Sequence, residues 1–266
     1  MEKNSNRHVF ILCPPFCGST ILWRMLSTSG SVSHLPREGQ FIPQAKPLMR
    51  GDDTWNPDKD IPWQQVREIY EQHWDQSKPY LLEKSPPNII TKRALEIEQH
   101  FSPAHFILLV RNPYAHCEGL MRRRGFTAKK SAEFTIECLA YQRENQKKLK
   151  NLTSINYEEL VKSPLSVSEK IQQDLPLFTD IKHDASFKVH SIHGLVKRKI
   201  VDLNQEKINN LSNTSLREIN SVLENEKELM EYWGYSYHHP SMRHLFAHIQ
   251  TRTRLVLKKI NKGFRH

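Results

Sequence analysis

Four short apolar runs are spaced along the chain as far as Tyr157. They cover residues 8–13, 80–83, 105–110 and 152–157. Three of them are almost continuously hydrophobic instead of alternating with polar residues, which is typical of strands that helices cover on both faces. Each run is followed by a segment with helical spacing. The pattern therefore predicts βαβ units and an α/β fold with a largely parallel sheet.

Helical periodicity predicts the elements between and after these runs. The expected helices cover residues 19–29, 63–76, 87–100, 113–124, 128–151, 163–174 and 215–233. Residues 31–62 contain five prolines and show no regular period, and a connection of that length inside a compact domain is usually a lid or a binding loop. Neither internal repeats nor low-complexity tracts interrupt the pattern. We expect one domain over residues 1–240, followed by a helix over residues 241–266.

Composition narrows the class of protein. The 266 residues include 39 Lys and Arg against 29 Asp and Glu, a formal charge of +10, with 38% hydrophobic and 26% charged residues. These values exclude a fibre, a disordered chain and a disulfide-rich mini-protein. Four irregularly spaced cysteines suggest reduced thiols, and no run reaches the ~20 apolar residues that cross a bilayer. We expect a soluble, cytoplasmic protein.

The positive charge gathers in two places. One is the block Arg122-Arg123-Arg124, which also fits a solvated helix end. The other is the segment 241–266, where apolar and basic residues alternate as in a basic amphipathic helix. Such a helix could lie on an anionic membrane, hold a polyanion, or be an ordinary solvated terminal helix. No helix-turn-helix, zinc-finger or RNA-binding signature is present, so we expect no specific nucleic acid.

The first chemical signal is the turn after the first apolar run. Its sequence is Pro14-Pro15-Phe16-Cys17-Gly18-Ser19-Thr20. A Gly-Ser-Thr turn that opens a helix presents backbone N–H groups and hydroxyls to an anion, although an ordinary capped turn has the same form. It is not a kinase P-loop, because no Lys precedes the hydroxyl residues. Cys17 as a phosphatase-like nucleophile is disfavoured, because Arg24 already lies within the helix.

Two further strand ends carry charge. Arg111 follows the third run and precedes Asn112 and Pro113, and Glu83 and Lys84 end the second run. Because the carboxyl ends of parallel strands meet at one edge of a sheet, these groups are expected near the anion turn. The alternatives are a surface ion pair for Glu83 with Lys84 and a structural carboxylate partner for Arg111.

Together these segments resemble the sulfotransferases that use 3′-phosphoadenosine 5′-phosphosulfate (PAPS), in particular the bacterial and carbohydrate-type branch. The motifs that carry the resemblance are Pro15-Phe-Cys-Gly-Ser-Thr20, Glu83-Lys-Ser-Pro86, Arg111-Asn-Pro113, Tyr157-Glu-Glu-Leu160 and His190-Ser-Ile-His-Gly-Leu-Val-Lys-Arg198. They occur in the family's order across residues 8–235. The resemblance implies a P-loop-like three-layer sandwich with four or five sheet strands, and sulfuryl transfer from PAPS to a hydroxyl of a carbohydrate or other small acceptor.

The resemblance also implies roles for individual residues. Glu83 would be the general base and Lys84 would offset charge on the bridging oxygen. The residues that would bind PAPS are Phe16, Cys17, Gly18, Ser19, Thr20, Ile21, Arg111, Gly119, Tyr157 and Arg198. No metal is expected, because the sulfuryl group carries less charge than a γ-phosphoryl group and no metal-ligand cluster is recognisable. The sequence sets no oligomeric state.

Three positions depart from the family pattern. Phe16 stands where the family has a basic residue, Gly119 where it has a Ser that binds the 3′-phosphate, and Leu195 where it has an Asn. Lys84 is the nearest sequence candidate to replace the missing basic group. These departures leave open a family member that binds another nucleotide or catalyses poorly.

Several readings of single residues also remain. Glu38 is a second candidate base, and His190 and His193 fit packing roles better than acid/base catalysis. The aromatic residues around the irregular segment suit a sugar or an apolar alcohol, or the core. They are Trp55, Trp63, Tyr70, Trp74 and Tyr80. A nucleotide or small-molecule kinase is an alternative function, and a non-enzymatic binder of nucleic acid or anionic surfaces is another.

Overall fold

The computed structural model describes residues 8–50, 59–85, 91–191 and 194–263. Within it the chain forms two compact units. The first comprises residues 1–110 and 141–185, and the second comprises residues 111–140 and 186–266. Each is described by itself. The sequence analysis expected one domain to end at residue 240, and that domain boundary stays a prediction.

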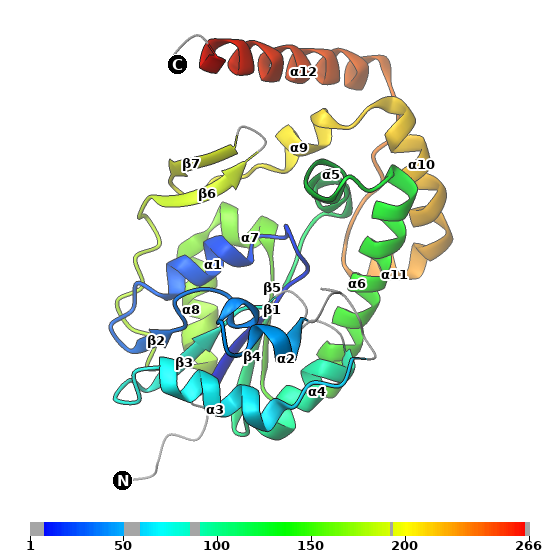
Figure 1. Ribbon diagram of the computed structural model, residues 1–266. Helices are drawn as coiled ribbons and strands as arrows, with labels where there is room; N and C mark the ends of the chain where they lie inside the picture. The colour runs from blue at the N-terminus through cyan, green and yellow to red at the C-terminus, as the bar shows by residue number, and fades with distance from the viewer. Residues whose placement is uncertain (1–7, 51–58, 86–90, 192–193, 264–266) are drawn as a thin grey trace. The chain divides into compact units, whose positions relative to one another are not determined.

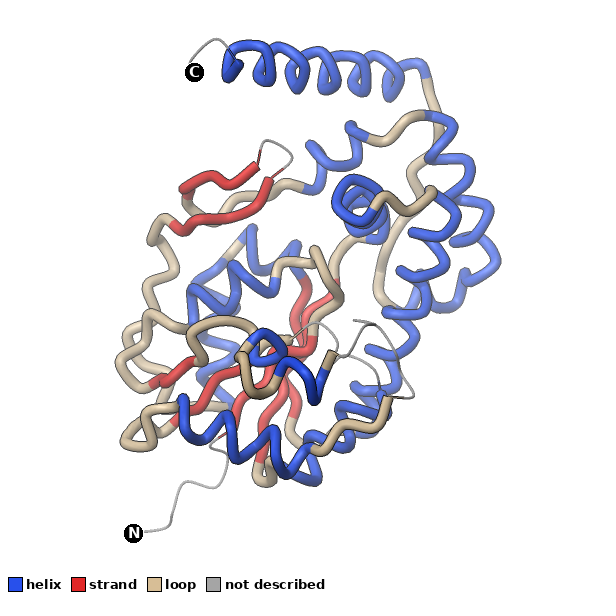
Figure 2. Tube along the Cα trace, in the orientation of Figure 1, coloured by secondary structure: helices blue, strands red, loops and turns tan. Residues whose placement is uncertain are grey.

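A five-stranded sheet forms the centre of the first unit. Its strands are β1 (His8–Leu12), β2 (Val32–His34), β3 (Tyr80–Glu83), β4 (Ala104–Val110) and β5 (Leu152–Asn156). They lie in the order β2-β3-β1-β4-β5 and every neighbouring pair is parallel (Figure 2). All residues of β1, β3 and β4 are buried, as their continuous hydrophobicity predicted. The α/β fold with a parallel sheet is confirmed.

Helices surround this sheet (Figure 1). Those of the first unit are α1 (Ser19–Leu26), α2 (Lys46–Met49), α3 (Trp63–His73), α4 (Thr91–His100), α7 (Tyr157–Lys162) and α8 (Pro164–Asp174), with a 3₁₀ turn, η1 (Gly39–Phe41). Because parallel crossovers are right-handed, α1 lies on one face of the sheet and α3 and α4 lie on the other. The helix α6 (Ala128–Lys148) contains the boundary between the units at Tyr141.

An aromatic cluster fills the core of the first unit on the side of α3 and α4. Phe101 lies within 6.5 Å, between ring centroids, of Phe10, Tyr70 and Trp74, and these four rings are at most 4% exposed. Trp63, Tyr70, Trp74 and Tyr80 are therefore core residues and not an acceptor surface. Trp55 lies outside the described residues.

The second unit consists of helices and a small hairpin. Its elements are α5 (Pro113–Arg124), β6 (Phe187–Ser191), β7 (Gly194–Arg198), α9 (Asn204–Asn210), α10 (Asn213–Leu223), η3 (Glu224–Glu226), α11 (Lys227–Tyr232) and α12 (Met242–Gly263). Strands β6 and β7 are antiparallel. The core forms between α5, the start of α6, and the helices α9, α10 and α11.

Several element predictions were wrong in detail. The motif His190–Arg198, for which no strand was expected, contributes residues to both β6 and β7, and the single helix expected over residues 215–233 is interrupted by η3. The irregular stretch over residues 31–62 contains β2, η1 and α2. Strand β2 has three residues, too few for its alternation to be recognised.

The helix α7 was also missed, although its sequence signal is present. Asn156 Oδ1 accepts a hydrogen bond from Glu159 N at 2.7 Å, while the Glu159 carboxylate accepts from Asn156 N at 3.2 Å. This reciprocal capping box is recognisable as Asn-x-x-Glu. No helix in the described part of the chain is both long and apolar enough to cross a membrane.

Candidate active site

The turn between β1 and α1 presents hydrogen-bond donors at the carboxyl end of the sheet. Gly18 has φ 115° and ψ 5°, a left-handed conformation that glycine adopts without strain. A Cβ atom at this position would lie 2.7 Å from Tyr157 Cδ2, so the tyrosine ring packs directly against the turn. Ser19 and Thr20 begin α1, whose first turn leaves backbone N–H groups without intrahelical acceptors. The turn therefore suits an anion.

Three other residues of the predicted site shape this turn. Phe16 has a positive φ of 67°, and the N–H of Cys17 donates to Pro14 O at 3.3 Å. The N–H of Ile21 donates to Gly18 O at 3.0 Å, so it serves the helix itself. The cofactor contacts expected of Phe16, Cys17 and Ile21 stay predictions.

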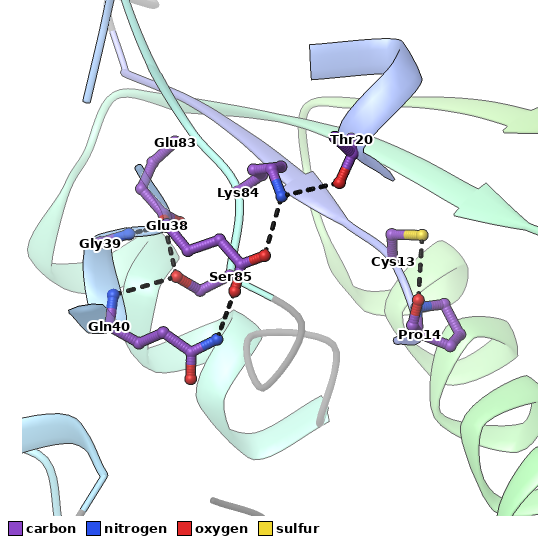
Figure 3. A network of polar contacts seen from close by, with 9 residues as sticks. All are labelled: Cys13, Pro14, Thr20, Glu38, Gly39, Gln40, Glu83, Lys84 and Ser85. Carbon is purple, nitrogen blue, oxygen red and sulfur yellow. Dashed lines mark hydrogen bonds and ion pairs between the residues drawn. The ribbon is translucent and has the colours of Figure 1, made fainter. Parts of the chain in front are cut away.

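Lys84 brings a positive charge to the turn. Its Nζ donates to Thr20 Oγ1 at 3.2 Å and forms an ion pair with Glu38 Oε1 at 2.8 Å (Figure 3). The Lys84 residue is 5% exposed, which strengthens both contacts relative to a solvated pair. Lys84 was the sequence candidate to replace the basic group missing at Phe16. The structure places its ammonium group at the first turn of α1.

Glu83 lies beside Lys84 in the chain but is buried in the interior. It is 0% exposed, and its Oε1 accepts hydrogen bonds from Ser85 Oγ at 2.5 Å and from Gly39 N at 2.9 Å. Burial raises the pKa of the Glu83 carboxyl to about 7, and the hydrogen bonds from Ser85 and Gly39 partly oppose this rise. Glu83 and Lys84 therefore form no surface ion pair. A carboxyl with this pKa exchanges its proton near neutral pH.

Tyr70 and Gly39 close the interior side of this network. A Cβ atom on Gly39 would overlap the Tyr70 hydroxyl, so only glycine fits there. Burial raises the pKa of Tyr70 well above its usual value, and the negative charge of Glu83 raises it further. The Tyr70 hydroxyl donates to Met49 Sδ at 3.0 Å. The buried phenol is therefore neutral at physiological pH and supports the backbone around Gly39.

Glu38 is the more accessible of the two carboxylates. Its side chain is 22% exposed, and its second oxygen, Oε2, accepts from Gln40 Nε2 at 2.6 Å. Gln40 N in turn donates to Ser85 Oγ at 3.3 Å, which links the segment carrying Glu38 to the end of β3. Ser85, Gly39 and Gln40 were missed by the sequence analysis. Only Ser85 had a signal, as a member of the Glu-Lys-Ser-Pro motif.

Arg111 and its neighbours belong to the second unit. Arg111 is 4% exposed, and its Nε donates to Asn204 Oδ1 at 2.7 Å. Asn112 Oδ1 accepts from the N–H groups of Tyr114 and Ala115 and caps α5. The Arg-Asn-Pro motif thus combines a helix start with a buried guanidinium. Asn204, at the start of α9, gave no sequence signal.

The other predicted residues have mixed outcomes. Gly119 is buried within α5, and Arg198 is the last residue of β7. Tyr157 is 4% exposed, and its ring packs against Gly18. His193 lies outside the described residues. In the basic block, Arg123 and Arg124 are exposed at the end of α5 as expected, whereas Arg122 is partly buried and its Nε forms an ion pair of 2.6 Å with the buried Glu118. No group of three His, Cys, Asp or Glu side chains among the described residues is arranged to hold a metal ion.

A comparison with known families identifies the family of the chain. Residues 8–180, which include every strand of the parallel sheet and both carboxylates, match the Sulfotransferase family. The chain belongs to the sulfotransferase family. No curated protein matches this sulfotransferase at a significant level.

Three solved structures of other sulfotransferases are similar to this chain to different extents. The sulfotransferase domain of the olefin synthase from Synechococcus PCC 7002 has a TM-score of 0.50 and 20% identity, over 67% of this chain and 76% of that one. A sulfotransferase from Alicyclobacillus acidocaldarius has a TM-score of 0.47 and 14% identity, over 83% and 96%. A mouse sulfotransferase complexed with PAP has a TM-score of 0.43 and 14% identity, over 66% and 61%.

Proposed function

We propose that this sulfotransferase transfers a sulfuryl group from PAPS to a hydroxyl of a carbohydrate or another small acceptor. The observation that carries the proposal is the convergence of Lys84 Nζ and Thr20 Oγ1 at the start of α1, with Glu38 beside them. A cation, a hydroxyl and free backbone N–H groups suit a phosphosulfate, and a carboxylate beside them suits proton removal from a hydroxyl.

Two groups of residues are proposed to bind the donor. When bound, PAPS would supply the sulfuryl group and leave as adenosine 3′,5′-bisphosphate (PAP). Ser19, Thr20 and the first turn of α1 would bind the 5′ end, as the donors of this turn allow. Arg111 and Arg198 are proposed for the 3′-phosphate. Arg111 Nε donates to Asn204 Oδ1, which fixes the plane of the guanidinium, and a planar guanidinium suits an oxyanion.

Lys84 is proposed to stabilise the negative charge that develops on the leaving oxygen. Its ammonium group is held in place by hydrogen bonds to Glu38 and to Thr20. It therefore needs little reorganisation when negative charge develops on the leaving oxygen. A preorganised donor of this kind is typically worth ~10²- to 10³-fold in rate.

Glu38 and Glu83 are the two candidates for the general base. Glu83, proposed from the sequence, has a pKa of about 7, which suits a base at neutral pH. Its carboxyl is fully buried under Gly39, whereas Glu38 is partly exposed next to Lys84. Because a base must first reach the proton that it removes, exposure favours Glu38 as the group that contacts the acceptor, and Glu83 remains the alternative.

The test combines donor binding with turnover. Calorimetry with PAP should show binding that Arg111→Ala weakens strongly, and the full chain should form PAP from PAPS only when a hydroxyl acceptor is present. Carbohydrate and simple alcohol acceptors can be compared in the same assay. Absence of PAP binding at millimolar concentration, or unchanged binding by the Arg111 variant, would contradict the proposal.

Two variants assign the base. Glu38→Gln and Glu83→Gln keep the size of each side chain, and the variant of the true base should lower kcat by roughly 10²-fold or more with little change in PAP affinity. We expect this result for Glu38→Gln. If only Glu83→Gln behaves so, Glu83 is the base.

The family assignment favours sulfuryl transfer over the kinase alternative. Magnesium-dependent turnover of ATP by this chain would reverse that preference. A cytoplasmic location remains part of the proposal, since the four cysteines are all buried free thiols, as in a reducing compartment.

A further inference from the structure

The outer side of α12 exposes a row of large apolar side chains. Five residues, which we call the apolar stripe, are each more than half exposed: Met242 65%, Phe246 65%, Ile249 52%, Val256 54% and Leu257 54%. At 100° per residue they fall within one arc of the helix. Soluble proteins usually turn such a stripe towards their core, so its exposure needs a physical explanation.

Polar contacts hold the opposite side of α12 to the rest of the second unit. His244 Nε2 donates to Leu211 O at 2.8 Å, and His248 Nδ1 donates to Asn209 O at 3.2 Å. The N–H of His244 is capped by Ser241 Oγ at 3.0 Å. These bonds fix α12 beside α9 (Figure 1), and both histidines lie on the side of α12 that faces this part of the second unit. The helix is therefore held with its apolar stripe facing away from α9.

The charge around the stripe is entirely positive. Residues 242–263 contain six Lys or Arg and no Asp or Glu, and no acidic residue follows Glu231 in the sequence. Arg243 and Arg252 are exposed, and helical spacing places them on either side of the stripe. An apolar stripe between basic flanks is the arrangement of helices that lie in the interface of an anionic bilayer.

We propose that α12 binds the surface of an anionic lipid membrane, with the apolar stripe inserted between the lipids and the flanking arginines at the headgroups. A soluble polyanion would contact the basic residues but leave the stripe in water. A second copy of the chain would cover the stripe but bring two sets of positive charges together, which is unfavourable. Only a bilayer with anionic headgroups satisfies both features of the helix. The proposal does not depend on the sulfuryl-transfer reaction.

Co-sedimentation of the full chain with vesicles tests the proposal. Vesicles of phosphatidylcholine with about one third phosphatidylserine should bind the protein, pure phosphatidylcholine vesicles should bind it at least about tenfold more weakly, and salt near 0.5 M should release much of it. Absence of binding to the anionic vesicles at low salt overturns the proposal.

Variants of exposed residues separate the two contributions. Phe246→Ser with Ile249→Ser should weaken binding about tenfold or more, because two inserted side chains are lost. Arg243→Gln with Arg252→Gln should weaken it by about fivefold per charge on anionic vesicles only. The matched control is Leu165→Ser with Val201→Ser, which removes two exposed apolar side chains elsewhere (48% and 40% exposed) and should change nothing. Retained far-ultraviolet circular dichroism shows that each variant folds.

Three outcomes would overturn the proposal. The apolar-stripe variant could bind as well as the wild type, or the control could lose binding to the same extent. Sedimentation velocity without lipid could also show a dimer that only the apolar-stripe variant dissociates, in which case the stripe is an interface between two copies of the chain.

Discussion

Lys84 Nζ lies 2.8 Å from Glu38 Oε1 and 3.2 Å from Thr20 Oγ1, so one ammonium group joins a carboxylate of the irregular segment to the start of α1. No neighbouring positions of the chain create this contact, because residues 20, 38 and 84 come from three separate segments. Lys84 thereby brings an ammonium group to the start of α1, next to a turn over residues 14–20 that contains no basic residue.

Replacing Lys84 tests that role. Lys84→Met keeps the length of the side chain but removes its charge, and we expect kcat to fall by roughly 10²- to 10³-fold, with a much smaller loss of PAP affinity. Steady-state kinetics and calorimetry measure the two effects. Lys147→Met, at an exposed ion pair, is the control and should leave both unchanged. A Lys84 variant with near-normal kcat would remove Lys84 from the mechanism.

The buried carboxyl of Glu83 should make stability depend on pH. Its pKa is raised from 4.5 to about 7, so the unfolded chain ionises first and the folded chain loses stability as the pH rises from about 4.5 to about 7. The difference corresponds to about 3 kcal/mol in the free energy of unfolding. Below pH 4.5 both states hold the proton, and above pH 7 the loss is complete.

Urea unfolding at several pH values checks this expectation. Glu83→Gln cannot ionise, so it should remove the pH-dependent loss and gain stability relative to the wild type between pH 5 and pH 8. Glu133→Gln, at a side chain that is 54% exposed, is the control. Parallel pH profiles for the wild type and the Glu83 variant would show that the carboxyl titrates normally.

Gly18 should be intolerant of any side chain. Gly18→Ala adds left-handed strain and a Cβ that meets the Tyr157 ring at 2.7 Å, so we expect a loss of about 2 to 4 kcal/mol in stability. Gly125 has a φ of +67° with nothing within 4 Å of an added Cβ. Gly125→Ala therefore measures the strain alone, roughly 1 kcal/mol. Equal losses in thermal or chemical unfolding would mean that Tyr157 moves away at no cost.

Asn204 is expected to position Arg111. Asn204→Ala removes the acceptor of Arg111 Nε, and PAP affinity should fall about tenfold while kcat at saturating PAPS changes little. Asn209→Ala on the same helix is the control and should keep the affinity. If the two variants bind PAP equally, the hydrogen bond to Asn204 does not prepare Arg111 for the ligand.

The local pattern of the chain was enough to predict the main elements of the fold. Continuous apolar runs identified β1, β3 and β4, because strands covered on both faces need no polar alternation, and a shorter run with alternating burial identified β5. Gly18 before Ser19 and Thr20 identified the turn between β1 and α1, because glycine adopts its left-handed conformation without strain. The apolar and basic spacing of residues 241–266 predicted α12 for the same local reason.

The tertiary structure decided what contacts what. Glu83 and Lys84 are adjacent in the sequence, yet one is buried under Gly39 and the other reaches Thr20, because successive residues at a strand end point in opposite directions. The pairing of Arg111 with Asn204 spans 93 residues, and no local signal encodes such a contact. The sequence also predicted that α12 has an apolar face and a basic face, but it did not predict which face points towards the rest of the chain. Which face is outward depends on where His244 and His248 find backbone acceptors, and only the packed chain supplies those.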